Sequence, residues 1–246
     1  MSDRPRDYPR IEVRTKEWEP ERCEEIGYGG EAAVYKIDST LVAKIFHLPD
    51  SDTFETDADR KSAIERHRDM QVKLFALPEG LPEEVVVPTH LIENKHGRII
   101  GYAMPFKAGM TLETYTKTTS MLSDGKILHL LGKLYDTIMA LHQKGVVIGD
   151  LNESNVLVCG GTPYLIDVDS MQFGGFRSRA FTPRFTDPHL LEVQQTWISK
   201  SLFTWPAKVI GRILWVICRV TPPLRHRSFV WRLRLWGAKK PHAENI

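Results

Sequence analysis

Cysteine is scarce in this chain. Only three cysteines occur among 246 residues, and Cys23, Cys159 and Cys218 are odd in number and far apart. This spacing excludes the dense disulfide framework of small secreted domains and is typical of a protein from a reducing compartment. None of the nine histidines stands at zinc-ligand spacing from cysteines or acids. The common zinc motifs are therefore excluded as well.

A long apolar run is missing at the start of the chain. The segment 1–7, MSDRPRD, is polar and does not predict a signal peptide, so a cytoplasmic protein is expected. Of all residues, 42% are hydrophobic and 26% are charged. These proportions are ordinary for a globular protein with a sizeable core, and they agree with a compact enzyme.

The most informative motif is the stretch 147–155, VIGDLNESN. Its Asp150 and Asn155 keep a D-L-x-x-x-N spacing that puts a carboxylate and an amide on one short loop. A hairpin-like segment, 156–166, follows, and Asp167 comes directly after it. Phosphoryl transfer from ATP needs a carboxylate that orients the acceptor hydroxyl and Mg²⁺ held by acidic and amide oxygens. We therefore expect Asp150 to be catalytic, and Asn155 and Asp167 to be metal ligands.

A second motif, 26–34, reads IGYGGEAAV. It resembles the glycine-rich loop G-x-G-x-x-G-x-V, in which bare backbone amides approach phosphate oxygens. Gly27, Gly29 and Gly30 are the expected phosphate-binding glycines. Ala32 stands where a third glycine is usual and is small enough for the same purpose.

Lys44 ends the segment Val42-Ala43-Lys44, which is similar to the V-A-I-K strand of the same motif set. Its ammonium group is expected to neutralise phosphate charge and to pair with a glutamate on the following helix. Glu65 is the expected partner because it lies inside the charged segment 55–77, which has helical spacing. Glu55 is a poorer rival, since it falls at the start of that helix.

These motifs, in this order, resemble those of the protein-kinase-like superfamily. The residues within them resemble the divergent bacterial kinase-like domains of that superfamily. The resemblance implies an α+β, two-lobed fold that binds ATP and Mg²⁺. It implies a small β-rich N-lobe over 21–106 and a helical C-lobe core over 107–195. Residues 1–20 are then an N-terminal extension, and the C-lobe is truncated, with 196–246 as a separate C-terminal segment.

The same resemblance assigns the residues around the adenine. Val34 and Ala43 would line its pocket, while Met104 and Phe106 would form the hinge against which it stacks. Together with the three glycines and Lys44, they complete the expected nucleotide site.

Several positions depart from the common Ser/Thr kinase pattern. Ile148 and Gly149 replace the His-Arg before the catalytic aspartate, which makes control by activation-loop phosphorylation through that arginine unexpected. Asn152 stands where a lysine is usual, which leaves both a protein and a small-molecule acceptor open. Asp169 replaces a glycine. It is either a further metal ligand or, as we expect, part of an exposed turn.

Local patterns predict the elements around these motifs. We expect three strands within 21–46, further strands at 85–87 and within 91–104, and a turn at 94–97. The helix over 55–77 should bury one stripe, and a short helix should begin near 111. Ser123 is expected to cap a long helix. The helix predicted within 55–77 buries Ile64, His67, Val72, Phe75 and Ala76, and the long helix buries Ile127, Leu130, Leu131, Leu134, Ile138 and Leu141.

Beyond residue 174 the kinase pattern thins out. The segment 182–189 resembles the end of an activation segment, whereas 196–246 carries ten basic residues, one acid and five of the six tryptophans. Such a segment suits peripheral contact with an anionic membrane surface or with single-stranded nucleic acid. It also suits a helix packed on the acidic remainder, or a tail without an evolved role. These alternatives stay open.

Three functions are compatible with the sequence. The first is an ATP- and Mg²⁺-dependent phosphotransferase acting on a hydroxyl, most simply a protein Ser/Thr and otherwise a small alcohol. The second is a pseudokinase that binds nucleotide or serves as a scaffold. The third is a membrane or nucleic-acid adaptor on a kinase-like fold.

Overall fold

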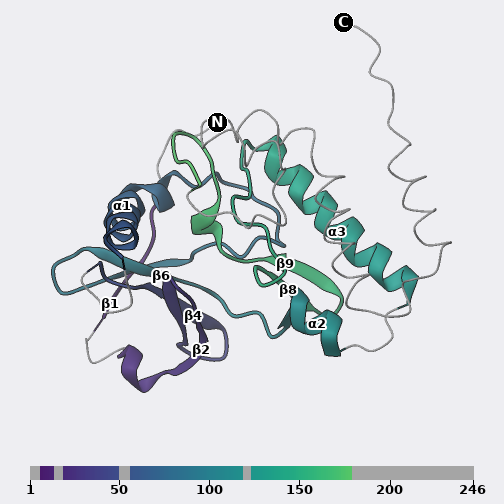
Figure 1. Ribbon diagram of the computed structural model, residues 1–246, viewed down its shortest axis with the longest axis horizontal. Coiled ribbons are helices and arrows are strands. Elements are labelled where there is room, and N and C mark those ends of the chain that lie inside the picture. The colour runs from purple at the N-terminus through teal and green to yellow at the C-terminus, as the bar shows by residue number, and fades with distance from the viewer. Residues whose placement is uncertain (1–5, 14–18, 50–55, 119–122, 179–246) are drawn as a thin grey trace, which may run out of the picture.

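The computed structural model describes residues 6–13, 19–49, 56–118 and 123–178. The fold is mixed α+β (Figure 1). The N-terminal part holds a large sheet, and the part that follows it holds a smaller sheet and two helices, α2 (Leu112–Thr118) and α3 (Asp124–Gln143). The segments 182–189 and 196–246, for which an activation-segment end and a basic surface are expected, lie outside the described residues.

The large sheet has six strands in the order β1-β5-β6-β4-β3-β2. All neighbours are antiparallel except β1 and β5. Three of the strands fall within 21–46, which confirms that prediction. The strands are β1 (Arg10–Glu12), β2 (Glu24–Tyr28), β3 (Ala32–Lys36), β4 (Leu41–Phe46), β5 (His90–Glu93) and β6 (Ile99–Pro105).

Strand β1 comes from the segment expected to be an N-terminal extension. It pairs in parallel with β5, so that Arg10 faces Leu91. Just before it, Tyr8 is buried, and its hydroxyl donates a hydrogen bond of 3.2 Å to the Leu74 carbonyl. Part of this segment therefore belongs to the sheet and its core.

Helix α1 (Asp57–Lys73) and the short 3-10 turn η2 (Leu74–Ala76) confirm the predicted helix. The Thr56 hydroxyl caps α1 by accepting the N–H of Asp59 at 3.1 Å. The predicted buried stripe is partly wrong, because Ile64 and Val72 are more than half exposed and Ala76 is exposed as well. The buried residues of α1 are instead Ala63, Met70 and Lys73.

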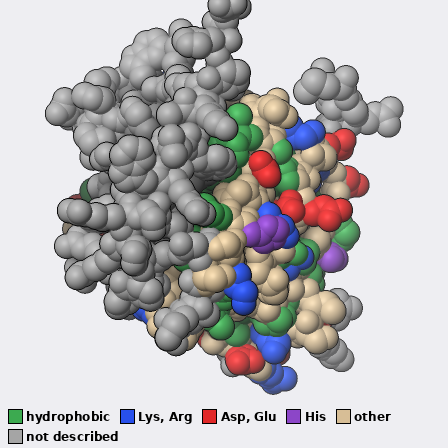
Figure 2. Space-filling model, turned by 90° about the vertical axis from the view of Figure 1, so that its right-hand side faces the viewer, with side chains coloured by type: hydrophobic (Ala, Val, Ile, Leu, Met, Phe, Trp, Pro, Cys, Tyr) green, Lys and Arg blue, Asp and Glu red, His purple; other side chains and the backbone are tan. Residues whose placement is uncertain are grey.

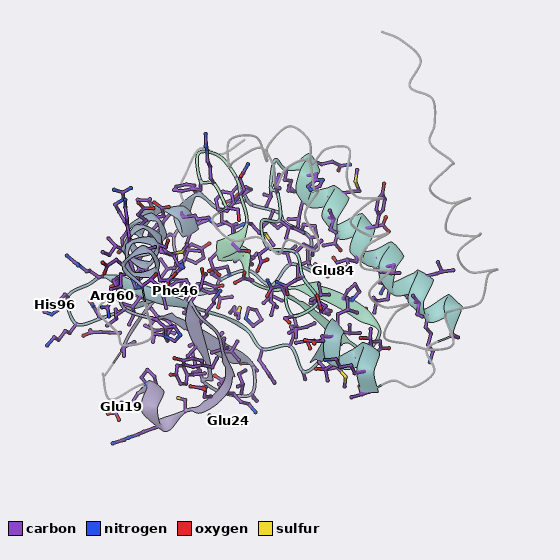
Figure 3. The ribbon with its side chains drawn as sticks, viewed as in Figure 1. Glu19, Glu24, Phe46, Arg60, Glu84 and His96 are labelled. Carbon is purple, nitrogen blue, oxygen red and sulfur yellow. The ribbon has the colours of Figure 1, made fainter. Side chains whose placement is uncertain are left out.

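The burial of a lysine on α1 has a physical reason. The Lys73 ammonium donates a 2.5 Å hydrogen bond to the carbonyl of Asp169, which lies in a charged cluster described below. A helix that faces charged groups presents charged side chains to them, so hydrophobicity does not mark its inner face. The apolar end of β4 also meets this helix, since Phe46 is buried in edge-to-face contact with His67 (Figure 3).

The turn predicted at 94–97 joins β5 to β6 and places Gly97 at φ 70°. The strand expected at 85–87 does not form. Val85 makes only an isolated parallel bridge to Leu165, and the Val86 N–H donates to the Leu165 carbonyl at 2.8 Å. These contacts join the N-terminal part directly to the smaller sheet.

The second part holds a three-stranded antiparallel sheet, β7-β8-β9, and two helices. The bounds are β7 (Met110–Thr111), α2 (Leu112–Thr118), α3 (Asp124–Gln143), β8 (Val156–Cys159) and β9 (Thr162–Leu165). Ser123 is the residue before α3, although its side chain makes no cap hydrogen bond. The six apolar positions predicted for the interior of α3 are all buried, which confirms that stripe.

One hydrophobic core connects the two parts. It combines Leu91 and Tyr102 of the large sheet with Leu134 and Leu141 of α3. No helix within the described residues is long and apolar enough to cross a membrane. On the face shown in Figure 2, hydrophobic, basic and acidic side chains are interspersed.

Candidate active site

Lys44 lies at the centre of the candidate site. Strand β4 is an inner strand, and Lys44 pairs there with Val34 on β3 and Tyr102 on β6. Its side chain is 12% exposed and makes ion pairs with both Asp167 and Asp169. The distances from its Nζ to the two carboxylate oxygens of Asp169 are 2.8 and 3.0 Å. Two of the acidic positions of the motif region thus converge on one lysine.

The backbone at Asp167 has an uncommon conformation. With φ 72° and ψ 46° it is left-handed, and it is the only non-glycine residue with positive φ in the described part of the chain. Asp167 precedes the 3-10 turn η3 (Val168–Ser170), and its carbonyl accepts the Ser170 N–H at 3.2 Å. Aspartate tolerates this region better than most residues, and such conformations gather at functional sites.

Asp169 is buried, so the expected exposed turn is wrong. Its side chain is 4% exposed. The Tyr102 hydroxyl donates to its Oδ1 at 2.5 Å, and Lys73 donates to its backbone carbonyl. A buried carboxylate needs such partners, because an unpaired one would be very costly.

Asp150 and Asn155 lie together on one loop. The Asn155 side-chain amide donates to the Asp150 carbonyl at 2.9 Å, and that of Asn152 donates to Asp150 Oδ2 at 3.0 Å. Asn152 Oδ1 also accepts the backbone N–H groups of Ser154 and Asn155, at 2.9 and 3.0 Å. Asn152, which stands where a lysine is usual, therefore holds the loop in shape.

The loop is also tied to the segment that carries Asp167. The Ile166 N–H donates to the Asn155 carbonyl at 3.1 Å. Further along, Val147 and Gln172 exchange backbone hydrogen bonds of 2.8 and 2.7 Å. The predicted metal ligands Asn155 and Asp167 are therefore brought together by backbone contacts on both sides.

Asp167 and Asn155 carry oxygen atoms of the kinds that Mg²⁺ binds. Mg²⁺ prefers one or two carboxylates with water and phosphate oxygens completing its shell. Asp167 supplies a carboxylate that is 20% exposed. Asn155 uses its amide nitrogen toward Asp150, which leaves its Oδ1 as the atom for a cation. Within the described residues, no group of three or more His, Cys, Asp or Glu side chains forms a metal site.

Gly149, which stands in place of an arginine, lies against the backbone. A Cβ added there would overlap the carbonyl oxygen of Ser170 and the side chain of Ser178. Only glycine fits without a shift of these atoms, so the departure from the common pattern follows from packing.

The glycine-rich segment forms the turn between β2 and β3. The Gly29 N–H donates to the Ala32 carbonyl at 2.9 Å, and Glu31 in the turn makes a 2.5 Å ion pair with Arg66 of α1. A Cβ at Gly30 would meet nothing within 4 Å, and one at Gly27 would make only ordinary contact with Val34. Gly29 and Gly30 thus leave the turn bare, whereas Gly27 lies in β2 next to a bulge. The space around the three glycines does not require a residue without a side chain.

Strand alternation places Ala43, which was expected at the adenine pocket, on the opposite face of the sheet from Lys44. Ala43 packs with Ile92 and Ala103 on the face of the sheet opposite Lys44. Val42 lies on the Lys44 face, in the same cluster as Met104. Successive side chains of a strand point to opposite faces, so Ala43 cannot share a pocket with Lys44.

The remaining expected adenine residues do share one face. Met104 is buried, and Val34 and Phe106 pack against the same cluster, which contains Val42 as well. The alternation of β4 could have identified Val42 from the sequence. Tyr102 carried no such signal, because its role depends on the pairing of β4 with β6.

The expected pair between Lys44 and Glu65 does not form. Lys44 takes Asp167 and Asp169 as its carboxylate partners among the described residues. Glu65 is half-buried on α1. The residues of α1 that line a cavity of about 30 Å³ with Asp169 are instead Arg66, Asp69, Met70 and Lys73. Asp167 and Asp169 therefore pair with Lys44 in place of the expected glutamate of α1.

The pKa values of Asp167 and Asp169 are shifted in opposite directions. Burial raises the pKa of Asp167, and the nearby charge of Asp169 raises it further, against the effect of Lys44. For Asp169, burial is outweighed by Lys44, Tyr102 and Lys73, so its pKa is lowered. When two carboxylates share one cation, the better-bonded one keeps the charge. Asp169 is that residue.

Comparison of the chain with models of protein families and with curated proteins found no match.

Proposed function

We propose that this protein is an ATP- and Mg²⁺-dependent phosphotransferase with a two-lobed, kinase-like fold. The observation that carries the proposal is the convergence of Lys44 from β4 with Asp167 after β9. The loop with Asp150 and Asn155 is tied to that same segment. These residues lie far apart in the sequence, and they are the ones that phosphoryl transfer requires.

Lys44 is the residue proposed to contact the phosphates. It sits on the sheet face that it shares with Val42 and Met104. A cation fixed on a rigid strand can neutralise phosphate charge without further ordering. Adenine would lie against the apolar residues of this face, toward Phe106, where the N-terminal part ends.

Asp150 is the residue proposed to orient the acceptor hydroxyl. Its Oδ2 accepts hydrogen bonds from the amides of Asn152 and Asn155, at 3.0 and 3.4 Å. These bonds fix the carboxylate, so that it can accept a proton from a hydroxyl at one position. The acceptor is a protein Ser/Thr or a small alcohol.

Asp167 and Asn155 are the residues proposed to hold Mg²⁺. The ion would neutralise charge on the phosphates during transfer. Because Lys44 pairs with Asp167, bound ATP would draw the ammonium partly from that carboxylate to its phosphates and leave Asp167 for the ion. Asp169 keeps Lys44 in place during this exchange.

Two measurements test the proposal. ATP should raise the melting temperature, and Mg²⁺ should increase that effect, because a ligand that binds only the folded state stabilises it. Asp167→Ala should keep the effect of ATP alone but lose the increment from Mg²⁺. The absence of any ATP effect in the parent would rule out the proposal.

A nucleotide-binding module without transfer is the second candidate. It is favoured by the occupation of Lys44 by two carboxylates, since a phosphate must compete with both. Incubation with γ-labelled ATP and a panel of protein and alcohol acceptors separates the two. Thermal stabilisation by ATP without labelled product would support the module.

A further inference from the structure

The carboxylate oxygens of Asp169 already have hydrogen-bond partners in the protein, unlike those of a carboxylate that binds a metal ion. Both of its carboxylate oxygens contact the Lys44 ammonium, and Oδ1 also accepts the Tyr102 hydroxyl. Its side chain is 4% exposed, compared with 20% for Asp167. The more open carboxylate is suited to an ion that retains waters and phosphate oxygens, and the enclosed one is not.

Three separate elements hold Asp169. Lys44 and Tyr102 are register partners on the neighbouring strands β4 and β6, with side chains on the same face. Lys73, from the last turn of α1, donates to the Asp169 carbonyl and is itself buried. Two strands therefore fix the carboxylate of Asp169 and the helix fixes its backbone, and the carboxylate in turn fixes the lysine.

The helix α1 supplies no glutamate to Lys44. Glu65 is not among the partners of this lysine, and the helix instead contributes Lys73, on the far side of Asp169. The connection between helix and lysine is therefore indirect. It passes through a residue of the turn η3.

From these contacts we infer that Asp169 is a positioning residue that holds Lys44 toward the nucleotide in place of a helix glutamate, with Tyr102 and Lys73 holding Asp169. The inference rests on the proposed function for its catalytic meaning. Asp167 and Asp169 then have different tasks, of which the first is to bind the ion and the second is to hold the lysine. This arrangement also explains an aspartate at the position where a glycine is usual.

The first experiment measures Lys44 itself and does not depend on ATP. Acylation of lysines at fixed pH by an amine-reactive ester, followed by mass spectrometry, reports how freely each lysine reacts through its deprotonated amine, which forms an amide and releases the alcohol of the ester. In Asp169→Asn, Lys44 should react faster than in the parent, while Lys133, which hydrogen-bonds Thr162, serves as the internal reference. Glu65→Gln removes the same charge from α1 and should leave Lys44 unchanged.

The second experiment measures catalysis. Asp169→Asn should lower kcat/KM by about 10- to 100-fold, the range for partners that orient a functional group, and should keep the thermal increment from Mg²⁺. Tyr102→Phe removes one hydroxyl and should lower it by about two- to tenfold. Since Tyr102→Phe is the milder change, it tests the inference even if Asp169→Asn does not fold.

The outcomes are distinct. An effect of Glu65→Gln with none from Asp169→Asn or Tyr102→Phe would overturn the inference. Loss of the Mg²⁺ increment in Asp169→Asn, equal to that in Asp167→Ala, would make Asp169 a metal ligand and also overturn it. If the parent binds no ATP, the proposed function fails, but the acylation of Lys44 still decides whether Asp169 holds this lysine.

Discussion

Lys44 and Tyr102 are direct cross-strand partners, and both donate to the carboxylate of Asp169. Cross-strand neighbours on one face of a sheet lie close enough for their side chains to meet a common group. The register of β4 and β6 therefore determines where Asp169 is held, and through it the path of the segment that follows β9. The position of Lys44 is set by the sheet before any ligand binds.

Lys44→Met should destabilise the fold as well as impair catalysis. The change removes the cation that Asp167 and Asp169 share in a largely buried cluster. Removing one partner of a buried ion pair costs about 3–5 kcal/mol, because the other charge is left uncompensated. Urea unfolding should show this loss in the free energy of unfolding.

A double mutant tests the cause. If uncompensated charge is responsible, adding Asp169→Asn to Lys44→Met should restore part of the lost stability, since the two changes act on one interaction. Strictly additive losses would show that the charges of Lys44 and Asp169 are not coupled in the folded protein.

Asp150→Asn should lower turnover by about 10²- to 10⁴-fold, the range for loss of a general base. Nucleotide affinity should change little, because the proposed phosphate contacts come from Lys44 and the glycine turn. Steady-state kinetics with ATP titration separates the two effects. Ser154→Ala is the control. Ser154 is exposed on the same loop, and its change leaves the side-chain contacts of Asp150 in place. Equal turnover in parent and Asp150→Asn would contradict the assignment.

Much of the local structure was predictable from the sequence. The hairpin turn at 94–97 and the stripe of α3 depend on neighbours in the chain, and their patterns predicted them correctly. The inner face of α1 was not predictable in this way. It faces charged groups, so Lys73 is buried while Ile64 is exposed.

Contacts between distant segments account for the other differences. The pairing of β1 with β5 joins residues about eighty positions apart, and no local pattern signals it. The burial of Asp169 depends on Tyr102 and Lys73, which lie on two other elements. By contrast, strand alternation could have predicted that Val42, and not Ala43, lies on the same face as Lys44.

Gly149→Ala should destabilise the fold by roughly 1–3 kcal/mol, the usual cost of overpacking. The added Cβ would overlap the Ser170 carbonyl oxygen and the Ser178 side chain, and so push the Asp150 loop away from the segment after η3. Thermal unfolding measures the loss. Gly132→Ala is the matched control. It adds the same methyl group within α3, where nothing lies within 4 Å, and should stabilise the helix by about 0.5–1 kcal/mol. Equal melting temperatures for both variants would contradict the packing argument.

His142 should make the fold sensitive to mild acid. It lies in the last turn of α3 with 7% of its surface exposed, and burial lowers its pKa below the ordinary 6.5. The unfolded chain therefore takes up a proton more readily than the folded one, and stability falls as the pH drops through the unfolded value of about 6.5 toward the folded pKa. Urea unfolding between pH 7.5 and 5 should show this slope, and His142→Gln should reduce it.

The control for this slope is His96, which is exposed at the tip of the turn between β5 and β6 (Figure 3). His96→Gln makes the same histidine-to-glutamine change at an exposed position and so controls for the substitution itself. Asp169 affects the same measurement only at lower pH, since its lowered pKa gives stability that is lost as the pH falls below the ordinary aspartate value of 3.8. A difference between parent and His142→Gln that is confined to the range near pH 6 therefore identifies the histidine. Identical slopes for the two proteins would show that His142 accepts its proton without loss of packing.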